Sequence, residues 1–363
     1  MAAKRLTVLL TNDDGPPGYE SPYTFGLYKH LTRTLGWDVR VVIPSSQKSW
    51  IGKAYQIKDI VRGRFYYPRD PDGAGETSDS SRPLKEGEIG EWILIDGTPA
   101  SCANIALHNL YPGEIDLVVS GPNLGRNTSG EFVWRGNDGR VIYSCRSWVA
   151  AFSLSSGTLG AALSSSLSQI RSIALSYGTI RRYPSQTLFD PAHALSTKII
   201  QHLWDNWGED GGGLRNGEVD LYSVNIPMIP GLLGESSLPI IWTRIWRNTY
   251  HRLFKAYSPK QASGLEHSDF QTGPDSPITT SAQAVTQARA DISPKNPTDL
   301  SFQFSPDMSG LIDLQPSSLP EGSDTWAIEK GWVSVSPLRA SFGEPPEFAT
   351  GGVLQDRIWK IKL

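Results

Sequence analysis

The chain has 363 residues, a formal net charge of −3 and two cysteines. This length allows a sizeable hydrophobic core without cross-links, and two cysteines cannot form a disulfide framework. The slightly acidic balance argues against a basic surface for nucleic acid or an anionic membrane, and no apolar run is long enough to span a bilayer. Because the first predicted strand leaves no room for a signal peptide before it, we expect a soluble, cytoplasmic protein.

The N-terminal segment predicts a strand, a helix and a second strand. An apolar run over residues 6–10 is cut off by Thr11-Asn12-Asp13-Asp14-Gly15, which is typical of a buried parallel strand ending in a loop. Leucines at helical spacing predict a helix over residues 23–35, and residues 37–43 form the next strand. This unit predicts a parallel sheet with a right-handed crossover. The first connection has no G-x-G-x-x-G pattern, so the sequence lacks a dinucleotide fingerprint.

The rest of the chain continues the α/β pattern. Further strands are expected over residues 57–67, 91–95, 115–120, 172–176, 219–226 and 300–304, helices over residues 99–110 and 191–204, and a helix within residues 151–168. Thr98 as N-cap and Pro99 at the first helical position fit the start of the helix at 99–110. A helical turn and a strand are expected within residues 324–342. We therefore predict a single domain over residues 5–342, with a flexible loop at 70–88, an atypical insert at 130–149 and a polar insert at 258–299. Residues 343–363 are expected to form a C-terminal tail.

Two of the loops that follow predicted strands carry oxygen donors. Asp13 and Asp14 follow the first strand, and Asn123 and Asn127 follow the strand at 115–120. Ligands bind beyond the carboxyl ends of strands in open α/β sheets, and hard divalent cations prefer oxygen ligands. The residues alone leave a second interpretation open, in which both segments are simple turns stabilised by Asn and Asp side chains.

Two other segments are rich in hydroxyl groups and glycine. The loop over residues 44–52 contains Ser49 and would lie beside Asp13 if the first two strands are neighbours; otherwise it is a solvated surface loop. Ser156, Gly157 and Thr158 open a helix rich in alanine and leucine. Such a helix N-terminus can bind an anion through its free amides and its dipole. A helix of small residues packed closely on a sheet would show the same composition.

The stretch over residues 240–257 alternates aromatic and basic side chains. Such a pattern can bind single-stranded nucleic acid. Because the stretch is short and the whole chain is acidic, we expect a projecting hairpin used in subunit contact, and no nucleic-acid polymer as a partner.

Taken together and in this order, the motifs resemble the SurE family of metal-dependent nucleotidases and phosphatases. The matching segments are Thr11 to Gly15, Pro44 to Ser49, Gly97 to Cys102, Ser120 to Asn127, Ser156 to Ala162, Val224 to Pro227 and Gly331 to Leu338. The Ser-Ser-Gln-Lys-Ser-Trp-Ile-Gly form of the second motif is similar to the fungal branch of the family. The resemblance implies a three-layer, Rossmann-like fold with a mostly parallel sheet, a projecting hairpin and a C-terminal extension.

The resemblance also implies an activity and a site. The expected reaction is hydrolysis of nucleoside monophosphates or related small phosphate esters with one divalent ion, Mg²⁺ or Mn²⁺, in a homodimer or higher oligomer. The implied metal ligands are Asp13, Asp14, Ser49 and Asn123. The implied phosphate contacts are Asn12, Asn127, Ser156, Gly157 and Thr158. The implied catalytic residues are Asp13, Asp14 and Asn127, and the sequence does not decide which aspartate orients water or attacks directly.

Residues 130–149 depart from the family pattern, in which the motif around Asn127 runs almost directly into the motif at Ser156. One hypothesis is a retained intron, because Gly130-Glu131-Phe132 can be encoded with a donor GTGAGT and Trp148-Val149-Ala150 with an acceptor TAG. The alternative is a genuine surface loop. A displacement of about 1 Å at the site can lower activity by about a hundredfold. A catalytically impaired binding or scaffold protein is therefore the second functional hypothesis.

Overall fold

The computed structural model describes most of the chain. The described residues are 5–18, 21–124, 153–178, 184–234, 237–247, 252–256, 300–304 and 319–343, together with the backbone of β7 (Trp134–Arg135) and β8 (Val141–Ile142). The predictions for Asn127, for the polar insert at 258–299 and, beyond its first residue, for the tail at 343–363 lie outside these residues. Within the segment at 130–149, only the antiparallel pairing of β7 with β8 is described.

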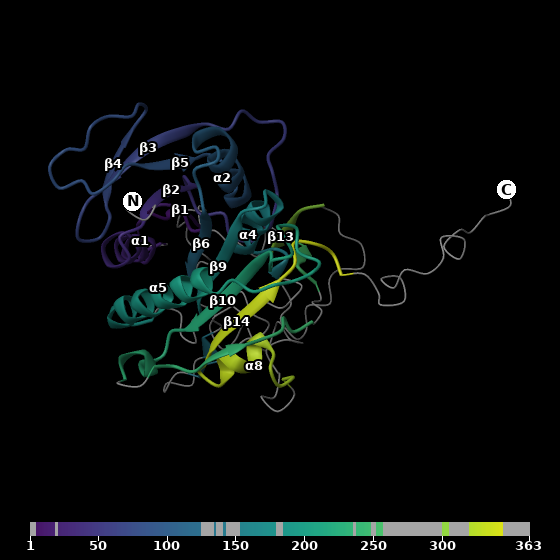
Figure 1. The fold of residues 1–363 in the computed structure, drawn as a ribbon. Coiled ribbons are helices and arrows are strands. Elements are labelled where there is room, and N and C mark those ends of the chain that lie inside the picture. Colours follow the sequence, from purple (N-terminus) through teal and green to yellow (C-terminus); the bar gives the residue numbers. More distant parts are fainter. Residues whose placement is uncertain are drawn as a thin grey trace, which may run out of the picture.

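A mostly parallel sheet forms the centre of the fold (Figure 1), with the strand order β11-β14-β10-β9-β6-β1-β2-β5-β3-β4. In that order the strands are β11 (Ile240–Trp242), β14 (Val333–Leu338), β10 (Leu221–Pro227), β9 (Arg171–Gly178), β6 (Leu117–Leu124), β1 (Thr7–Thr11), β2 (Asp38–Pro44), β5 (Trp92–Ile95), β3 (Gly63–Pro68) and β4 (Gly75–Ser78). The strands from β10 to β5 are parallel to one another, so their carboxyl ends meet at one edge. Strands β14 and β3 join them in the antiparallel direction.

Helices cover both faces of the sheet, and the alternation of side chains in β1 shows why. Val8 and Leu10 point to one face of the sheet and are buried against the side chains of its helices. Leu9 points to the opposite face and is buried against the helices there. The first face is covered by α1 (Thr24–Lys29), its π-helical continuation η1 (His30–Thr34) and α5 (Phe189–Asp205). The second is covered by α2 (Pro99–Ile105), its continuation η2 (Ala106–Leu110) and α4 (Gly157–Leu167). The predicted three-layer α/β fold is therefore confirmed.

The shorter helical elements are η3 (Gln186–Leu188), η4 (Pro230–Leu233) and α8 (Asp324–Glu329). Helix α8 precedes β14, as the sequence predicts. Among the described residues, no helix combines the length and the apolar composition needed to cross a membrane.

The segment at 70–88 contains regular structure that the sequence analysis did not predict. Residues 75–78 form β4, which pairs with β3 at the edge of the sheet. The Glu88 side chain is buried and accepts hydrogen bonds from both terminal nitrogens of Arg82, at 2.7 and 2.8 Å. These bonds lower the pKa of Glu88 to about 2. A featureless loop was expected because this segment is polar, but its polar side chains pair with one another.

The prediction of one projecting hairpin over residues 240–257 is wrong. Residues 240–242 form β11, which pairs in parallel with β14 at the edge of the main sheet. Strand β12 (Phe254–Ala256) instead pairs antiparallel with β13 (Phe302–Phe304) in a separate ribbon. Both pairings join residues that are far apart in the sequence, so a local pattern could not reveal them.

Strand β6 continues past Ser120, where we expected it to end. Its pairing with β9 shifts between Ser120 and Asn123 and then resumes. Such a bulge re-aims the side chains that follow it. A Cβ atom on Gly121 would lie 2.1 Å from the carbonyl oxygen of Leu175, so only glycine fits this close approach. Asn123 is thus placed on a strand and not in a loop.

Candidate functional site

The loop after β1 is shaped by the side chain of Asn12. Its Nδ2 donates to the carbonyl oxygen of Gly15 at 2.8 Å and to the hydroxyl of Thr24 at 3.0 Å, and its Oδ1 accepts from the Gly15 N–H at 3.1 Å. Asn12 is fully buried. These bonds hold the loop in shape, and the phosphate contact expected of Asn12 from the resemblance stays a prediction.

Asp13 lies against the N-terminus of α4. The Thr158 hydroxyl donates to Asp13 Oδ1 at 2.8 Å, and Thr158 is fully buried. A Cβ atom on Gly157 would lie 2.7 Å from the Cβ of Asp13. Ser156 is the N-cap of α4, and its hydroxyl accepts from the Leu159 N–H at 3.2 Å. Two of the three residues predicted as an anion cradle, Gly157 and Thr158, therefore lie against the first aspartate.

Asp14 is joined to the end of β6 through a tyrosine. The Tyr23 hydroxyl donates to Asp14 Oδ2 at 2.6 Å and accepts from the Leu124 N–H at 3.1 Å. The same N–H lies 3.3 Å from Asp14 Oδ2. Leu124 directly follows Asn123, so this small network connects the two strands that carry predicted metal ligands.

The loop after β2 contacts both β1 and α4. The Lys48 N–H donates to the carbonyl oxygen of Asp13 at 2.7 Å, and the Gly52 N–H donates to the carbonyl oxygen of Ser155 at 2.8 Å. Ser49 lies between these two anchors and is partly buried. The next residue, Trp50, has a φ of 64°, a left-handed backbone conformation that bulky residues rarely adopt. Such strain is concentrated at functional sites.

The structure thus gathers the predicted residues of four segments at the carboxyl edge of the sheet. They are Asn12, Asp13, Asp14, Ser49, Asn123, Ser156, Gly157 and Thr158. Asn127, predicted to contact phosphate, lies outside the described residues.

The side chains at this edge have the chemistry of a site for a divalent cation. Asp13 and Asp14 are 4% and 5% exposed, and burying carboxylates is costly unless a cation or hydrogen bonds compensate them. Carboxylate, hydroxyl and amide oxygens are hard donors, which Mg²⁺ and Mn²⁺ prefer. Among the described residues, no group of three or more His, Cys, Asp or Glu side chains could hold a metal ion, so the two aspartates would share a cation with neutral oxygen donors.

Tyr23 and Pro99 contribute to this end of the sheet but were not predicted as site residues from the sequence. Tyr23 fits the apolar spacing of α1, so its pattern predicts only a core residue. Pro99 opens α2 after the Thr98 N-cap, as predicted, and its Cγ lies 3.1 Å from the position of a Cβ on Gly157. Only the meeting of α2 with α4 reveals this contact.

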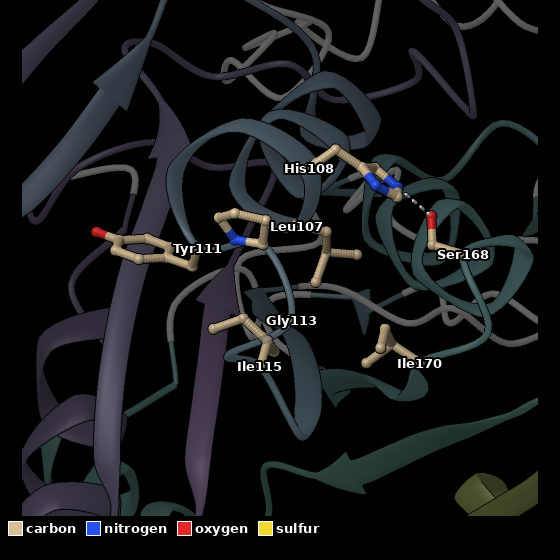
Figure 2. A pocket seen from close by; sticks show the side chains of 8 residues that line it. Leu107, His108, Tyr111, Gly113, Ile115, Ser168 and Ile170 are labelled. Carbon is tan, nitrogen blue, oxygen red and sulfur yellow. Dashed lines mark hydrogen bonds between the residues drawn. The ribbon is translucent and has the colours of Figure 1, made fainter.

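A separate cavity of about 230 Å³ lies at the amino ends of the parallel strands, opposite the end that carries the aspartates (Figure 2). It is lined by residues that follow α2 and α4 and precede β6 and β9, including Leu107, Ile115 and Ile170. The His108 Nε2 and the Ser168 hydroxyl form a hydrogen bond of 3.0 Å at its rim. The parallel strands begin there, so this cavity is distinct from the aspartate edge.

A family model described as "Survival protein SurE" matches residues 8–140 and 146–252. The chain belongs to the SurE family. A 5'-nucleotidase SurE from Synechocystis is 30% identical over 70% of this chain and 73% of its own length. A 5'-nucleotidase SurE from Campylobacter jejuni is 27% identical over 72% of this chain and 78% of its own length.

Two further relatives match nearly the whole chain, one in sequence and one in structure. "Probable tubulin--tyrosine ligase PBY1" of Saccharomyces cerevisiae is 30% identical over 93% of this chain, which spans 41% of that protein. The ligase name therefore describes a protein more than twice as long as the matching segment. The crystal structure of the SurE protein from Aquifex aeolicus is 20% identical, with a TM-score of 0.54, and covers 97% of this chain and 100% of its own. At this identity it supports the fold alone.

Proposed function

We propose that this SurE family member is a metal-dependent phosphomonoesterase that acts on nucleoside monophosphates or related small phosphate esters. The observation that carries the proposal is the burial of Asp13 and Asp14 at the carboxyl edge of the sheet, against the N-terminus of α4. The relatives named 5'-nucleotidase support the substrate class.

We assign Asp13, Asp14, Ser49 and Asn123 as the residues that hold one Mg²⁺ or Mn²⁺ ion. When bound, such an ion supplies Lewis acidity and lowers the pKa of a coordinated water. The hydroxyls of Thr158 and Tyr23 each fix one oxygen of an aspartate, which orients the carboxylates in advance.

The N-terminus of α4 and Asn127 are assigned to the phosphate group. The N–H groups of Gly157 and Thr158 belong to the first helical turn, where N–H groups have no partner within the helix. Together with the helix dipole they favour an anion and stabilise charge on the phosphate oxygens. Because the Thr158 hydroxyl already donates to Asp13, we assign its backbone N–H to this role.

The direct test is phosphate release from a panel of nucleoside monophosphates, in EDTA and with Mg²⁺ or Mn²⁺ added. We expect metal-dependent release, which Asp13→Asn and Asp14→Asn each lower by about a hundredfold or more. Asp79→Asn is the matched control, because its carboxylate is 87% exposed and lies on the distant β3–β4 edge. Release that is equal in EDTA, or that survives both substitutions, contradicts the proposal.

The second candidate is a catalytically impaired binding or scaffold protein. It is favoured by the segment at 130–149, which separates Asn127 from Ser156 in the sequence and contains residues 141–145, where the family model does not match. Calorimetric titration distinguishes the two candidates. Nucleotide binding without phosphate release in any metal supports the scaffold, whereas turnover excludes it.

We also propose that the chain forms a homodimer or higher homo-oligomer in the cytoplasm. The β12–β13 ribbon presents Phe254 and Phe302 at 54% and 58% exposure, and exposed apolar patches often mark contact surfaces. Light scattering coupled to gel filtration measures the assembly state. A Phe254→Ser/Phe302→Ser double variant is expected to shift the mass toward the monomer, and a monomeric wild type would contradict the proposal.

A further inference from the structure

Tyr23 lies between the two segments that carry the assigned ligands Asp14 and Asn123. Its side chain is fully buried, and its hydroxyl donates to Asp14 Oδ2 at 2.6 Å while accepting from the Leu124 N–H at 3.1 Å. A hydroxyl group is both a donor and an acceptor, so it can serve the carboxylate and the backbone amide at the same time. One side-chain atom therefore joins the loop after β1 to the end of β6.

The ring of Tyr23 is held by residues outside the site. It packs edge-on against Tyr177 and Phe189, each with a centroid distance of 6.0 Å and an interplanar angle of 71°. The Tyr177 hydroxyl in turn lies 2.7 Å from His193 Nδ1 and 3.1 Å from the Ser196 hydroxyl. Burial lowers the pKa of His193 to about 3, so this support stays neutral near physiological pH. Ring contacts with Tyr177 of β9 and Phe189 of α5 thus hold the ring of Tyr23 in place.

We propose that Tyr23 is a positioning residue for the metal site: its hydroxyl fixes the orientation of the Asp14 carboxylate and the spacing between Asp14 and Asn123. This inference rests on the proposed function, because it needs a cation held by those two residues. Groups that hydrogen-bond to a ligand orient it, and their loss typically lowers metal affinity by 10–100-fold. Tyr23 does this for two ligands that lie 109 positions apart in the chain. It bonds directly to Asp14, and it acts on Asn123 through the backbone N–H of the next residue, Leu124.

The test compares two substitutions that each delete one hydroxyl from a buried ring. Tyr23→Phe keeps the packing against Tyr177 and removes the link to Asp14. Tyr177→Phe is the matched control, because this ring is equally buried and packs on Tyr23, but its hydroxyl faces His193. The readout is the Mn²⁺ dissociation constant from the electron paramagnetic resonance signal of free Mn²⁺, with the melting temperature in EDTA as a check on folding.

We expect Mn²⁺ affinity to fall by about 10–100-fold in Tyr23→Phe and to change by less than about twofold in Tyr177→Phe. In an Asp14→Asn background, Tyr23→Phe should cost less affinity than in the wild type, because the contact with Asp14 is already altered and only the link to the Leu124 N–H remains to be lost. Wild-type affinity in Tyr23→Phe, or an equal loss in Tyr177→Phe, overturns the positioning role. A wild type that binds no Mn²⁺ refutes the proposed metal site itself, and the role of Tyr23 with it. If Mn²⁺ binds but no phosphate is released, the positioning role is still decided by the same affinities.

Discussion

Gly157 and Asp13 are in such close contact that a Cβ atom on Gly157 would lie 2.7 Å from Asp13 Cβ and 3.0 Å from Asp13 Oδ2. Real Cβ atoms do not tolerate such distances, so Gly157→Ala must displace either Asp13 or the first turn of α4. A displacement of about 1 Å at a catalytic group can cost about a hundredfold in rate. We therefore expect Gly157→Ala to lower metal-dependent phosphate release by about that factor.

The control for this substitution is Gly211→Ala. Gly211 has open space at the position of a Cβ atom and lies in the loop before β10, where the parallel strands begin, so we expect unchanged release. Melting temperatures of both variants separate a local displacement from unfolding. If Gly157→Ala is folded and fully active, the contact with Asp13 does not constrain the reaction.

Thr158 offers a test of whether its side chain serves the substrate or the metal. Its hydroxyl donates to Asp13 Oδ1 at 2.8 Å, so Thr158→Val should weaken Mn²⁺ binding by about 10-fold or more, whereas Thr158→Ser should restore it. Binding is measured by Mn²⁺ titration without substrate. A variant that binds Mn²⁺ normally but shows a raised KM would instead assign the hydroxyl to the phosphate.

The sequence predicted the parts of this fold that depend on local patterns. Examples are β1 with the apolar run before Asp13, the first helix with its spacing of Leu27 and Leu31, and α2 with its Thr98 cap. Each of these elements forms from residues that are neighbours in the sequence. Loops at strand ends then converge because parallel strands end at one edge. For this reason the loops that carry Asp13 and Asn123 were expected at the same end of the sheet.

The remaining features depend on contacts between distant residues. Tyr23 and Leu27 both fit the same apolar helix face, and only the position of β6 gives the Tyr23 hydroxyl its partners. The amide of Asn12 is used within its own loop because Thr24 folds back onto it. Similarly, β11 finds its place only because β14 presents an edge. Periodicity carries no information on such pairings.

Asp324 should make stability depend on pH. Its carboxylate is buried, Oδ1 accepts from the N–H groups of Trp246 and Thr325, and among the described residues Oδ2 has no hydrogen-bond partner. Burial raises the pKa of Asp324 from 3.8 to about 7. Between about pH 4 and pH 7 the folded state therefore holds a proton that the unfolded state has lost, so the free energy of unfolding falls as pH rises through this window.

The contribution of Asp324 is isolated by comparison with Asp324→Asn. The variant should lose the contribution of Asp324 to the pH dependence of stability. Its free energy of unfolding relative to the wild type should therefore increase from pH 5 to pH 8. The increase should be up to about 1.4 kcal/mol for each pH unit below the folded-state pKa of Asp324. Denaturant unfolding at both pH values measures this. Asp59→Asn, at an exposed carboxylate, serves as the control. A parallel pH profile of Asp324→Asn and wild type would show that Asp324 is ionised throughout.

Deletion of residues 130–149 tests whether the segment between the two site motifs affects catalysis. In the deleted chain Ser129 joins directly to Ala150, which restores the short connection of the family pattern. If the segment displaces Asn127 or the start of α4, the deletion should raise phosphate release, by as much as about a hundredfold for a shift of 1 Å. Mn²⁺ affinity should change little, because Thr158, Tyr23 and Leu124, which donate hydrogen bonds to Asp13 and Asp14, lie outside the deleted segment. Equal release by both forms would make the segment a tolerated loop, and silence in both would favour the scaffold protein. Activity of the deleted form alone would support a retained intron, which sequencing of the transcript then decides.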